Sequence, residues 1–272
     1  IDEGSQLTVG ESAIPLRRLR AGGRLVIAGD PLQLPPIVQG RYPRAEGEPL
    51  LHRSILECLA EHDDEPESGT RLLAPLVDNF RMNDVLCGYP ASSIYPPEYR
   101  PASDEIAARR LKVVPTGDEF VDLVLAPDRP LVLVVLEEVQ ATRENHAEAG
   151  LVARVVRALR EQSPLGDDQF WEEGLFCVGP HHAQNRLVRR AIAQELDESE
   201  RDVVDTVDRM QGQERDAIVV SYGVSDVEYA LQEKEFIYSL NRLNVAITRG
   251  RAKTIVFLSR RLLEPPVQAL DN

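Results

Sequence analysis

The latter half of the sequence alternates short apolar runs with segments of helical periodicity, and this alternation restricts the fold more than any other feature. The apolar runs cover residues 131–136, 175–179, 217–222 and 253–258, and helical spacing covers 144–162, 184–196 and 239–248. Strand and helix in turn predict a parallel sheet with right-handed crossovers and helices on both faces. The unbroken run from Leu131 to Leu136 is typical of a strand covered on both faces. The predicted fold class is therefore α/β.

The first part of the chain is less regular. Residues 24–30 (RLVIAGD) form an apolar run that ends in Gly-Asp-Pro, which predicts a buried strand followed by a loop. Helical spacing covers 49–61, and residues 72–80 have the composition of a strand. In parallel sheets ligands bind outside the carboxyl ends of the strands. We therefore expect most of the polar segments described below at that edge.

The composition excludes several classes of protein. No apolar run reaches the roughly 18 residues of a membrane span, and three cysteines without close pairing exclude a disulfide framework or a zinc ribbon. A reducing, cytoplasmic setting is expected. The net charge of −14 argues against a histone-like nucleic-acid binder but leaves room for a local basic groove. The sequence starts without Met and without a signal segment, so we expect a fragment of a longer protein.

Two polar segments follow the predicted strands of the first part. Asp2 and Glu3 come directly after Ile1, where neighbouring side chains diverge. One carboxylate can then hold Mg²⁺ while the other orients a water, as nucleotide hydrolysis requires. Gln33 lies in the loop after the second strand and can hydrogen-bond a terminal phosphate. Each segment alone is also compatible with a solvated turn, and the pairing of the two favours the nucleotide interpretation.

The segment from Asp205 to Glu214 (DTVDRMQGQE) is the most distinctive of the chain. Thr206, at a strand end, can bond a backbone phosphate of a nucleic acid, and Gln211-Gly212 predicts a turn that allows close approach. Glu214 can accept a hydrogen bond from a ribose hydroxyl. A loop that is merely solvated between two buried strands would not need so many polar residues, and this favours a functional role for the segment.

Two arginines have the placement of arginine fingers. Arg249 follows the predicted helix at 239–248, and Arg81 ends the triplet Asn79-Phe80-Arg81. An arginine at the rim of a second domain can stabilise the charge that develops on a γ-phosphate. For either residue taken alone, a surface ion pair is the simpler interpretation.

Taken together and in order, these segments resemble the superfamily 1 helicases, in particular the branch of the nonsense-mediated-decay helicase and the nuclease-helicases. The resemblance runs from Ile1 to about Ser259. It implies ATP and Mg²⁺ as cofactors and single-stranded DNA or RNA as partner. The implied roles are Mg²⁺ binding by Asp2, water activation by Glu3, γ-phosphate sensing by Gln33, arginine fingers at Arg81 and Arg249, nucleotide or relay contacts at Gln211, Gly212 and Glu214, and nucleic-acid contacts at Thr206, Pro180, His181 and Gln184.

The resemblance also implies a domain organisation. Residues 1–70 correspond to the C-terminal part of a first RecA-like domain, and residues 71–272 to a complete second one. ATP hydrolysis between the two domains is expected to drive movement along one strand. A phosphate loop has the sequence Gly-x-x-x-x-Gly-Lys-Ser/Thr. None of the three lysines, Lys112, Lys234 and Lys253, lies in such a sequence. We therefore expect the fragment alone to be inactive and the missing N-terminal part of the helicase to be its partner.

Two departures and two alternatives remain open at this point. Pro180-His181-His182-Ala183-Gln184 stands where the family commonly has Pro-Tyr-x-x-Gln, which puts a stacking or packing contact in doubt. The chain is alternatively a non-catalytic module that binds nucleic acid or a protein. A further alternative keeps the ATPase but replaces unwinding by translocation or remodelling.

Overall fold

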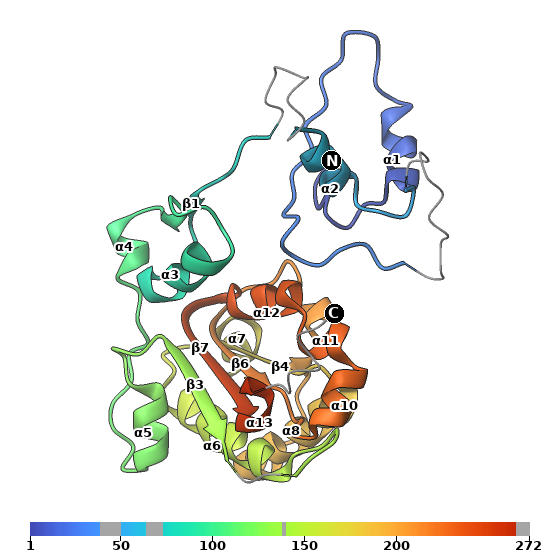
Figure 1. The fold of residues 1–272 in the computed structure, drawn as a ribbon. Helices are drawn as coiled ribbons and strands as arrows, with labels where there is room; N and C mark the ends of the chain where they lie inside the picture. Colours follow the sequence, from blue (N-terminus) through green and yellow to red (C-terminus); the bar gives the residue numbers. More distant parts are fainter. Residues whose placement is uncertain (39–49, 64–72, 138–139, 265–272) are drawn as a thin grey trace. The chain divides into compact units, whose positions relative to one another are not determined.

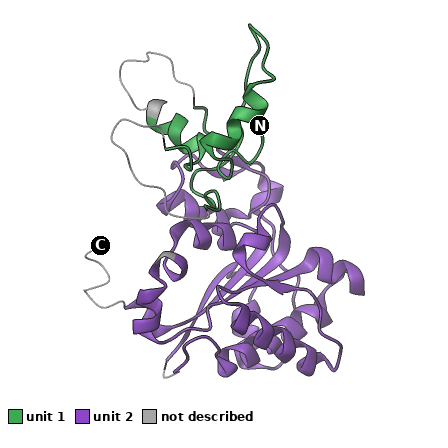
Figure 2. Ribbon diagram, turned by 90° about the vertical axis from the view of Figure 1, so that its right-hand side faces the viewer, with its two compact units in different colours: residues 1–76 green, residues 77–272 purple. Residues whose placement is uncertain are grey.

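The computed structural model describes residues 1–38, 50–63, 73–137 and 140–264, which divide into two compact units (Figures 1 and 2). The first unit is Ile1–Leu76 and the second is Val77–Asn272. The predicted domain boundary between residues 70 and 71 lies outside the described residues.

The second unit contains a five-stranded, fully parallel sheet, which confirms the predicted α/β class (Figure 1). The strand order is β3-β7-β6-β4-β5. The strands are β3 (Leu131–Leu136), β4 (Leu175–Val178), β5 (Val204–Asp205), β6 (Arg215–Ser221) and β7 (Gly250–Ser259). The four apolar runs predicted as strands in this half correspond to β3, β4, β6 and β7.

Helices cover both faces of this sheet. On one face α5 (Glu119–Leu125), α6 (His146–Gln162) and α8 (His182–Leu196) share a buried apolar cluster with alternate strand residues such as Val219 and Phe257. The helix α6 forms because its apolar side chains recur at helical spacing and the Asn145 side chain caps its first turn. Strand residues of the opposite parity, such as Ile218 and Val256, are also buried, and α12 (Leu240–Ile247) packs on β6.

One expectation for the sheet is wrong in detail. Leu131–Leu136 is a parallel strand, but within the described residues β3 lies at the edge of the sheet and pairs with β7 alone. The Leu133 side chain is consequently 50% exposed, whereas the central strands β6 and β7 are buried along most of their length. A continuous apolar run therefore did not require cover on both faces here.

The remaining elements of the second unit are short and lie around the sheet. They are β1 (Asp78–Asn79), β2 (Arg100–Pro101), α3 (Asp84–Ser93), α4 (Asp104–Ala107), α7 (Asp167–Gln169), the π-helix η1 (Phe170–Gly174), α9 (Val207–Met210), α10 (Val227–Gln232), α11 (Lys234–Ile237) and α13 (Arg260–Leu263). The strand expected at 72–80 is limited to β1, which pairs with β2. Among the described helices, none has the length and apolar character needed to cross a bilayer.

The first unit contains α1 (Val9–Leu16) and α2 (Ile55–Asp63), and the strand predicted at 24–30 is not present as such. Residues 26–28 exchange hydrogen bonds with residues 1–4, from Ile1 N to Val26 O, Ala28 N to Ile1 O and Gly4 N to Ala28 O. The described residues supply no further strand and no cover for this pair, and Val26 is 76% exposed. Two paired segments without a third strand or a packed face are at best marginally stable as a sheet, so the segment stays irregular.

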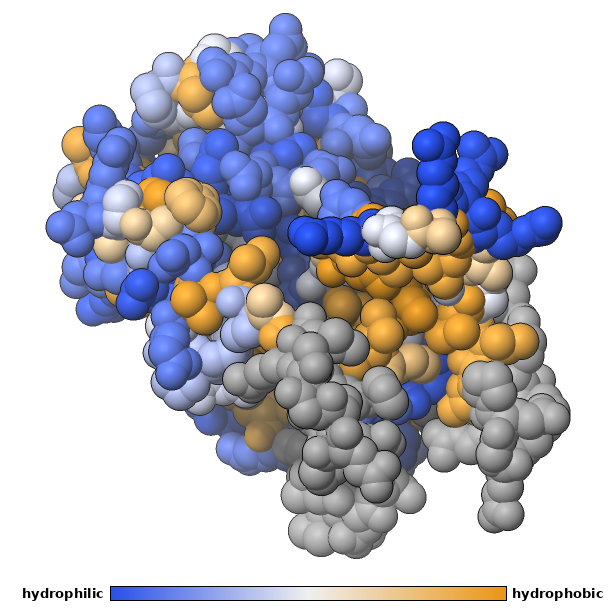
Figure 3. Space-filling model, turned by 90° about the horizontal axis from the view of Figure 1, so that it is seen from above, coloured by the Kyte–Doolittle hydropathy of each residue, from blue (hydrophilic) through white to orange (hydrophobic). Residues whose placement is uncertain are grey.

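Apolar side chains are exposed on the first unit. The large ones among its described residues are Ile14, Leu19, Leu25, Val26, Leu32, Ile37, Val38, Leu51, Leu73 and Leu76. Figure 3 shows apolar side chains gathered into a continuous area on one face of the molecule. An exposed apolar area of this kind is typical of a surface that another polypeptide covers.

Candidate functional site

The site residues predicted in the second unit lie at two opposite edges of its sheet. Arg215 and Gly250, the first residues of β6 and β7, are paired, and they adjoin Glu214 and Arg249 at the amino edge. Thr206 follows β5 at the carboxyl edge. The expectation that the polar segments lie mostly at the carboxyl edge is therefore wrong for the arginines, because the chain returns across the sheet between Thr206 and Glu214.

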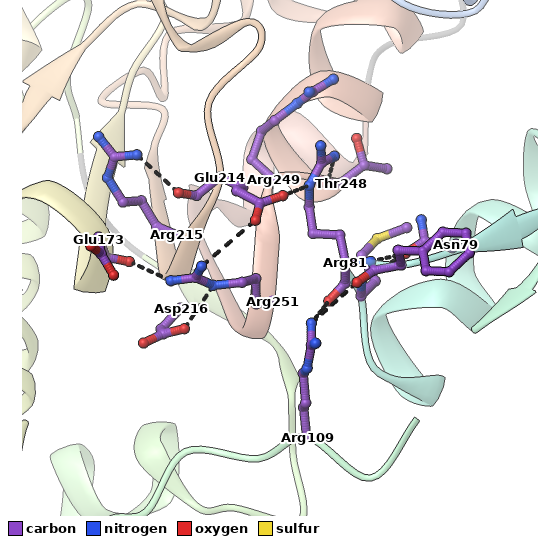
Figure 4. Close-up of polar contacts among 12 residues, drawn as sticks. Asn79, Arg81, Arg109, Glu173, Glu214, Arg215, Asp216, Thr248, Arg249 and Arg251 are labelled. Atoms are coloured by element: carbon purple, nitrogen blue, oxygen red, sulfur yellow. Dashed lines mark hydrogen bonds and ion pairs between the residues drawn. The ribbon is translucent and has the colours of Figure 1, made fainter. Parts of the chain in front are cut away.

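Arg81 and Glu214 are joined at the amino edge (Figure 4). The Arg81 Nε donates to Glu214 Oε2 at 2.7 Å, and its Nη1 donates to the carbonyl oxygen of Thr248 at 3.0 Å. Arg251 approaches the other carboxylate oxygen at 3.6 Å. The two guanidiniums, that of Arg81 first, hold the pKa of the Glu214 carboxyl below its usual value.

Arg249 reaches the same edge from a different element. Arg249 lies between the end of α12 and the start of β7 and is 4% exposed. Its Nε donates to the carbonyl oxygen of Val245 at 3.3 Å. Its own carbonyl oxygen accepts from Arg215 N at 3.1 Å. Figure 4 shows Arg81, Glu214 and Arg249 arriving at one region from three separate segments. The structure thus brings together three of the predicted site residues.

The predicted turn at Gln211-Gly212 is confirmed. Gln213 N donates to Met210 O at 3.0 Å, Gln211 has φ −58° and ψ 138°, and Gly212 has φ +77°. These angles define a type II turn, whose third position requires positive φ. A Cβ on Gly212 would meet no atom within 4 Å, so the glycine is needed for its backbone conformation and not for space.

At the carboxyl edge, His181 is packed among aromatic rings. It precedes α8, its ring lies 5.7 Å from Phe236 in a stacked arrangement, and it lies 5.6 Å from Tyr229 in a tilted one. Burial lowers the pKa of the His181 imidazole. The histidine that stands where the family commonly has tyrosine therefore still makes ring contacts. Pro180 lies beside it, partly buried, in the loop after β4.

Gln184 lies inside the protein. Its side chain is fully buried; Nε2 donates to Ser221 Oγ at 2.9 Å and Oε1 accepts from Asn145 N at 2.8 Å. Ser221 Oγ in turn donates to Glu148 Oε1 at 2.6 Å. These bonds join the first turn of α8 to Ser221 and to Asn145, and a contact of Gln184 with nucleic acid stays a prediction.

Thr206 remains at the surface of the carboxyl edge. It precedes α9, is partly buried, and its backbone N donates to Asp205 Oδ1 at 2.7 Å. Its hydroxyl makes no capping bond to α9. The helix α9 is tied to α12 by a bond from Arg242 Nη1 to Asp208 Oδ2 at 2.5 Å.

In the first unit, the two polar segments lie next to each other. The Gly4 N to Ala28 O bond holds the chain after Glu3 against the chain before Asp30. Glu3 N donates to Asp2 Oδ1 at 2.9 Å, and Gln33 Nε2 donates to Asp30 Oδ2 at 2.9 Å. Asp2 and Glu3 are exposed, and Glu3 has φ +51°, a conformation uncommon outside glycine. Exposed carboxylate oxygens are the ligands that Mg²⁺ prefers, so these residues fit that ion.

Comparison with known proteins identifies the family. Residues 51–261 match the family described as "AAA domain", so the chain belongs to this family. It is 25% identical over 271 residues to the probable helicase senataxin of Mus musculus, covering 97% of this chain and 9% of that protein. It is 28% identical over 273 residues to an uncharacterized ATP-dependent helicase of Methanocaldococcus jannaschii, and the match covers 97% of this chain and 36% of that protein.

These relatives bear out the resemblance to superfamily 1 helicases. A third relative is the DNA replication ATP-dependent helicase/nuclease of Arabidopsis thaliana, 26% identical over 272 residues, with 97% of this chain and 19% of that protein covered. The chain thus spans between 9% and 36% of these relatives. The C-terminal domain of a possible DNA helicase from Lactobacillus matches 58% of this chain and 97% of its own, with 16% identity and a TM-score of 0.30, which is too low to carry an argument.

Proposed function

We propose that this chain is the C-terminal portion of an ATP-dependent helicase or translocase that moves along a single strand of nucleic acid. The observation that carries the proposal is the convergence of Arg81, Glu214 and Arg249 from distant parts of the sequence at one edge of the sheet. Relatives named as ATP-dependent helicases support it.

In this proposal Arg81 and Arg249 stabilise the charge that develops on the γ-phosphate. Arginine serves this role because its guanidinium is permanently charged and forks toward phosphate oxygens. Glu214 orients Arg81 by the 2.7 Å bond, and the Gln211–Gly212 turn brings backbone close to the nucleotide. Arg81 binds Glu214 when the phosphate is absent and binds the phosphate when it is present. This change of partner couples hydrolysis to conformational change.

The carboxylates of the first unit complete the proposed chemistry. Asp2 holds Mg²⁺, which neutralises phosphate charge when bound. Glu3 accepts a proton from the attacking water, and Gln33 hydrogen-bonds the terminal phosphate. The proximity of residues 1–4 to residues 26–28 supports a common role for these side chains.

The proposal assigns the phosphate loop to another part of a longer protein. The described apolar side chains of the first unit, such as Ile14 and Val26, are exposed by 71% and 76%. Burial of such side chains contributes about 25 cal/mol per Å² of apolar area. We propose that the remainder of the first RecA-like domain covers this surface and supplies the glycine-rich loop.

The strand is proposed to follow the carboxyl edge of the second unit. Thr206 donates its hydroxyl to a phosphate oxygen, and Pro180 and His181 line the path. Strand-displacement assays distinguish a helicase from a translocase, and parallel assays on DNA and RNA identify the substrate.

ATP hydrolysis by the protein that includes the upstream coding sequence tests this proposal. Arg249→Ala is expected to lower kcat by about 10³-fold, the size of an arginine-finger effect. Arg157→Ala is a matched control, because it also removes a paired arginine but away from the amino edge. Arg157 lies on the exposed side of α6 and pairs with Glu161 of the same helix and Glu195 of α8. Equal hydrolysis by Arg249→Ala and wild type would instead favour a non-catalytic binding module.

A further inference from the structure

Arg109 contacts the segment that carries Arg81, although it lies outside every segment that predicted a site (Figure 4). It follows the short helix α4 and is partly buried. Within the part of the chain that the structure describes, its side chain donates two hydrogen bonds, and both go to backbone carbonyl groups. Arg109 therefore holds a piece of backbone and does not balance a carboxylate.

Both bonds come from one terminal nitrogen of the guanidinium. Nη1 of Arg109 donates to the carbonyl oxygen of Arg81 at 3.0 Å and to that of Phe80 at 3.3 Å. These carbonyls belong to the two peptide groups that flank the α-carbon of Arg81. Hydrogen bonds from a charged donor are stronger than those between neutral groups. Arg109 thus restrains the backbone on both sides of Arg81.

Asn79 binds the N–H groups of the same two peptide groups. Its Oδ1 accepts from Arg81 N at 2.8 Å and from Met82 N at 2.7 Å. All four polar groups of the two peptides are therefore bound by side chains, in a stretch between β1 and α3 that is neither helix nor strand. A group held in place before a reaction loses less entropy when the transition state forms, so this arrangement favours a precise placement of Arg81.

The side chain of Asn83 connects Arg109 to the central sheet. It is fully buried, and its Nδ2 donates to the carbonyl oxygen of Arg109 at 3.0 Å and to that of Ala252 at 2.9 Å. Ala252 lies in β7, which begins directly after Arg249. The backbone of Arg81 is consequently anchored, through Arg109 and Asn83, to the strand that follows the other proposed arginine finger.

The charge of Arg109 also acts on the partner of Arg81. The pKa of the Glu214 carboxyl is lowered mainly by Arg81 and, to a smaller extent, by Arg251 and Arg109. The guanidinium of Arg109 therefore lies near the Arg81–Glu214 pair. An experiment on Arg109 has to separate the loss of its hydrogen bonds from the loss of its charge, and a lysine variant does so.

We propose that Arg109 is a positioning residue for ATP hydrolysis: by holding the peptide groups on both sides of Arg81, it keeps the Arg81 guanidinium where it reaches the γ-phosphate. The inference rests on the proposed function in taking Arg81 as an arginine finger. Arg109 itself acts through Arg81 and not by touching the nucleotide.

The test compares kcat and KM for ATP among variants of the protein that includes the upstream coding sequence. Arg109→Met removes both hydrogen bonds and is expected to lower kcat about tenfold with little change in KM, the effect of losing a bond from a charged donor. Arg109→Lys keeps the charge and a donor and is expected to restore most of kcat. Arg100→Met is the matched control, because Arg100 approaches the same segment through its exposed pair with Asp78 at 3.1 Å.

A double variant shows whether Arg109 acts through Arg81. If it does, Arg81→Ala and Arg81→Ala/Arg109→Met have the same kcat, because the placement of a side chain that is absent no longer matters. A tenfold difference that persists without the Arg81 side chain, or wild-type kcat in Arg109→Met, would overturn the role of Arg109 and leave that of Arg81 intact. Wild-type kcat in Arg81→Ala would overturn both.

A second readout does not depend on hydrolysis. The Nε–H of Arg81 is bonded to Glu214, and its hydrogen exchange is measurable by NMR in the 272-residue chain. Arg109→Met is expected to speed this exchange about tenfold, whereas Arg100→Met leaves it unchanged. Equal exchange in wild type and Arg109→Met would contradict the inference, whether or not the longer protein hydrolyses ATP.

Discussion

Arg81 Nε and Glu214 Oε2 lie 2.7 Å apart, although 133 positions separate the two residues in the sequence. The bond ties the segment after β1 to the segment before β6. The same guanidinium donates to the carbonyl oxygen of Thr248, so the contact also reaches the end of α12. Three segments of the second unit are thereby fixed at the amino edge of the sheet.

This ion pair predicts a pH dependence of stability. The pKa of the Glu214 carboxyl is lowered in the folded protein, mainly by Arg81. Its contribution to stability is therefore present above the unfolded value of about 4.5 and is lost as the pH falls through the folded pKa. Thermal unfolding of Glu214→Gln between pH 3 and 7 is expected to show a smaller loss on acidification than wild type. Glu161→Gln, with its carboxylate exposed on α6, is the control, and a Glu214→Gln curve parallel to wild type would contradict the prediction.

The buried carboxyl of Glu148 predicts a dependence of opposite sign. Burial raises its pKa to about 7, although Ser221 Oγ and Gly223 N both donate to Oε1. The free energy of unfolding should therefore fall as the pH rises from about 4.5 to 7. Glu148→Gln keeps the acceptor and removes the ionisation. It is expected to abolish this fall and to be more stable than wild type at pH 8 by up to about 3 kcal/mol.

Chemical denaturation at several pH values measures this effect. Glu148→Ala serves as a second variant, because it removes both the ionisation and the acceptor for Ser221 and Gly223. It is expected to be less stable than Glu148→Gln at every pH. A wild-type protein whose stability does not change between pH 5 and 8 would contradict the account of Glu148.

Two glycines give opposite predictions for the same substitution. Gly212→Ala places a side chain at φ +77° and is expected to destabilise the protein by about 1 kcal/mol. Gly150→Ala lies within α6 with no atom near the new Cβ, and is expected to stabilise by about 0.5–1 kcal/mol. Urea unfolding of both variants checks the pair. Equal effects would show that backbone conformation does not distinguish the two positions.

The sequence predicted the second unit better than the first. The runs at 175–179, 217–222 and 253–258 correspond to β4, β6 and β7. Apolar runs of this length between helical segments are buried most readily as strands of a sheet that the helices cover. The run at 24–30 has the same composition but stays irregular and exposed. Burial of this run requires neighbouring strands and helices. Among the described residues, only residues 1–4 form backbone hydrogen bonds with it.

The candidate site was predictable where one segment carries it. The turn at Gln211-Gly212 follows from local backbone preference, and the structure confirms it. The burial of Gln184 depends on Asn145 and Ser221, which come from other elements, so spacing did not reveal it. The same holds for Tyr229 beside His181, a pairing of rings made only by the fold.

The central claim is that this chain supplies the carboxylates and guanidiniums of an ATPase whose phosphate loop lies in another part of the protein. Its most direct test is ATP hydrolysis, in the presence of single-stranded nucleic acid, by the 272-residue chain and by the protein that includes the upstream coding sequence. We predict no hydrolysis by the chain alone and hydrolysis by the longer protein that Glu3→Gln abolishes. Hydrolysis by the chain alone that Glu3→Gln abolishes, or full activity of the longer Glu3→Gln protein, would contradict the claim.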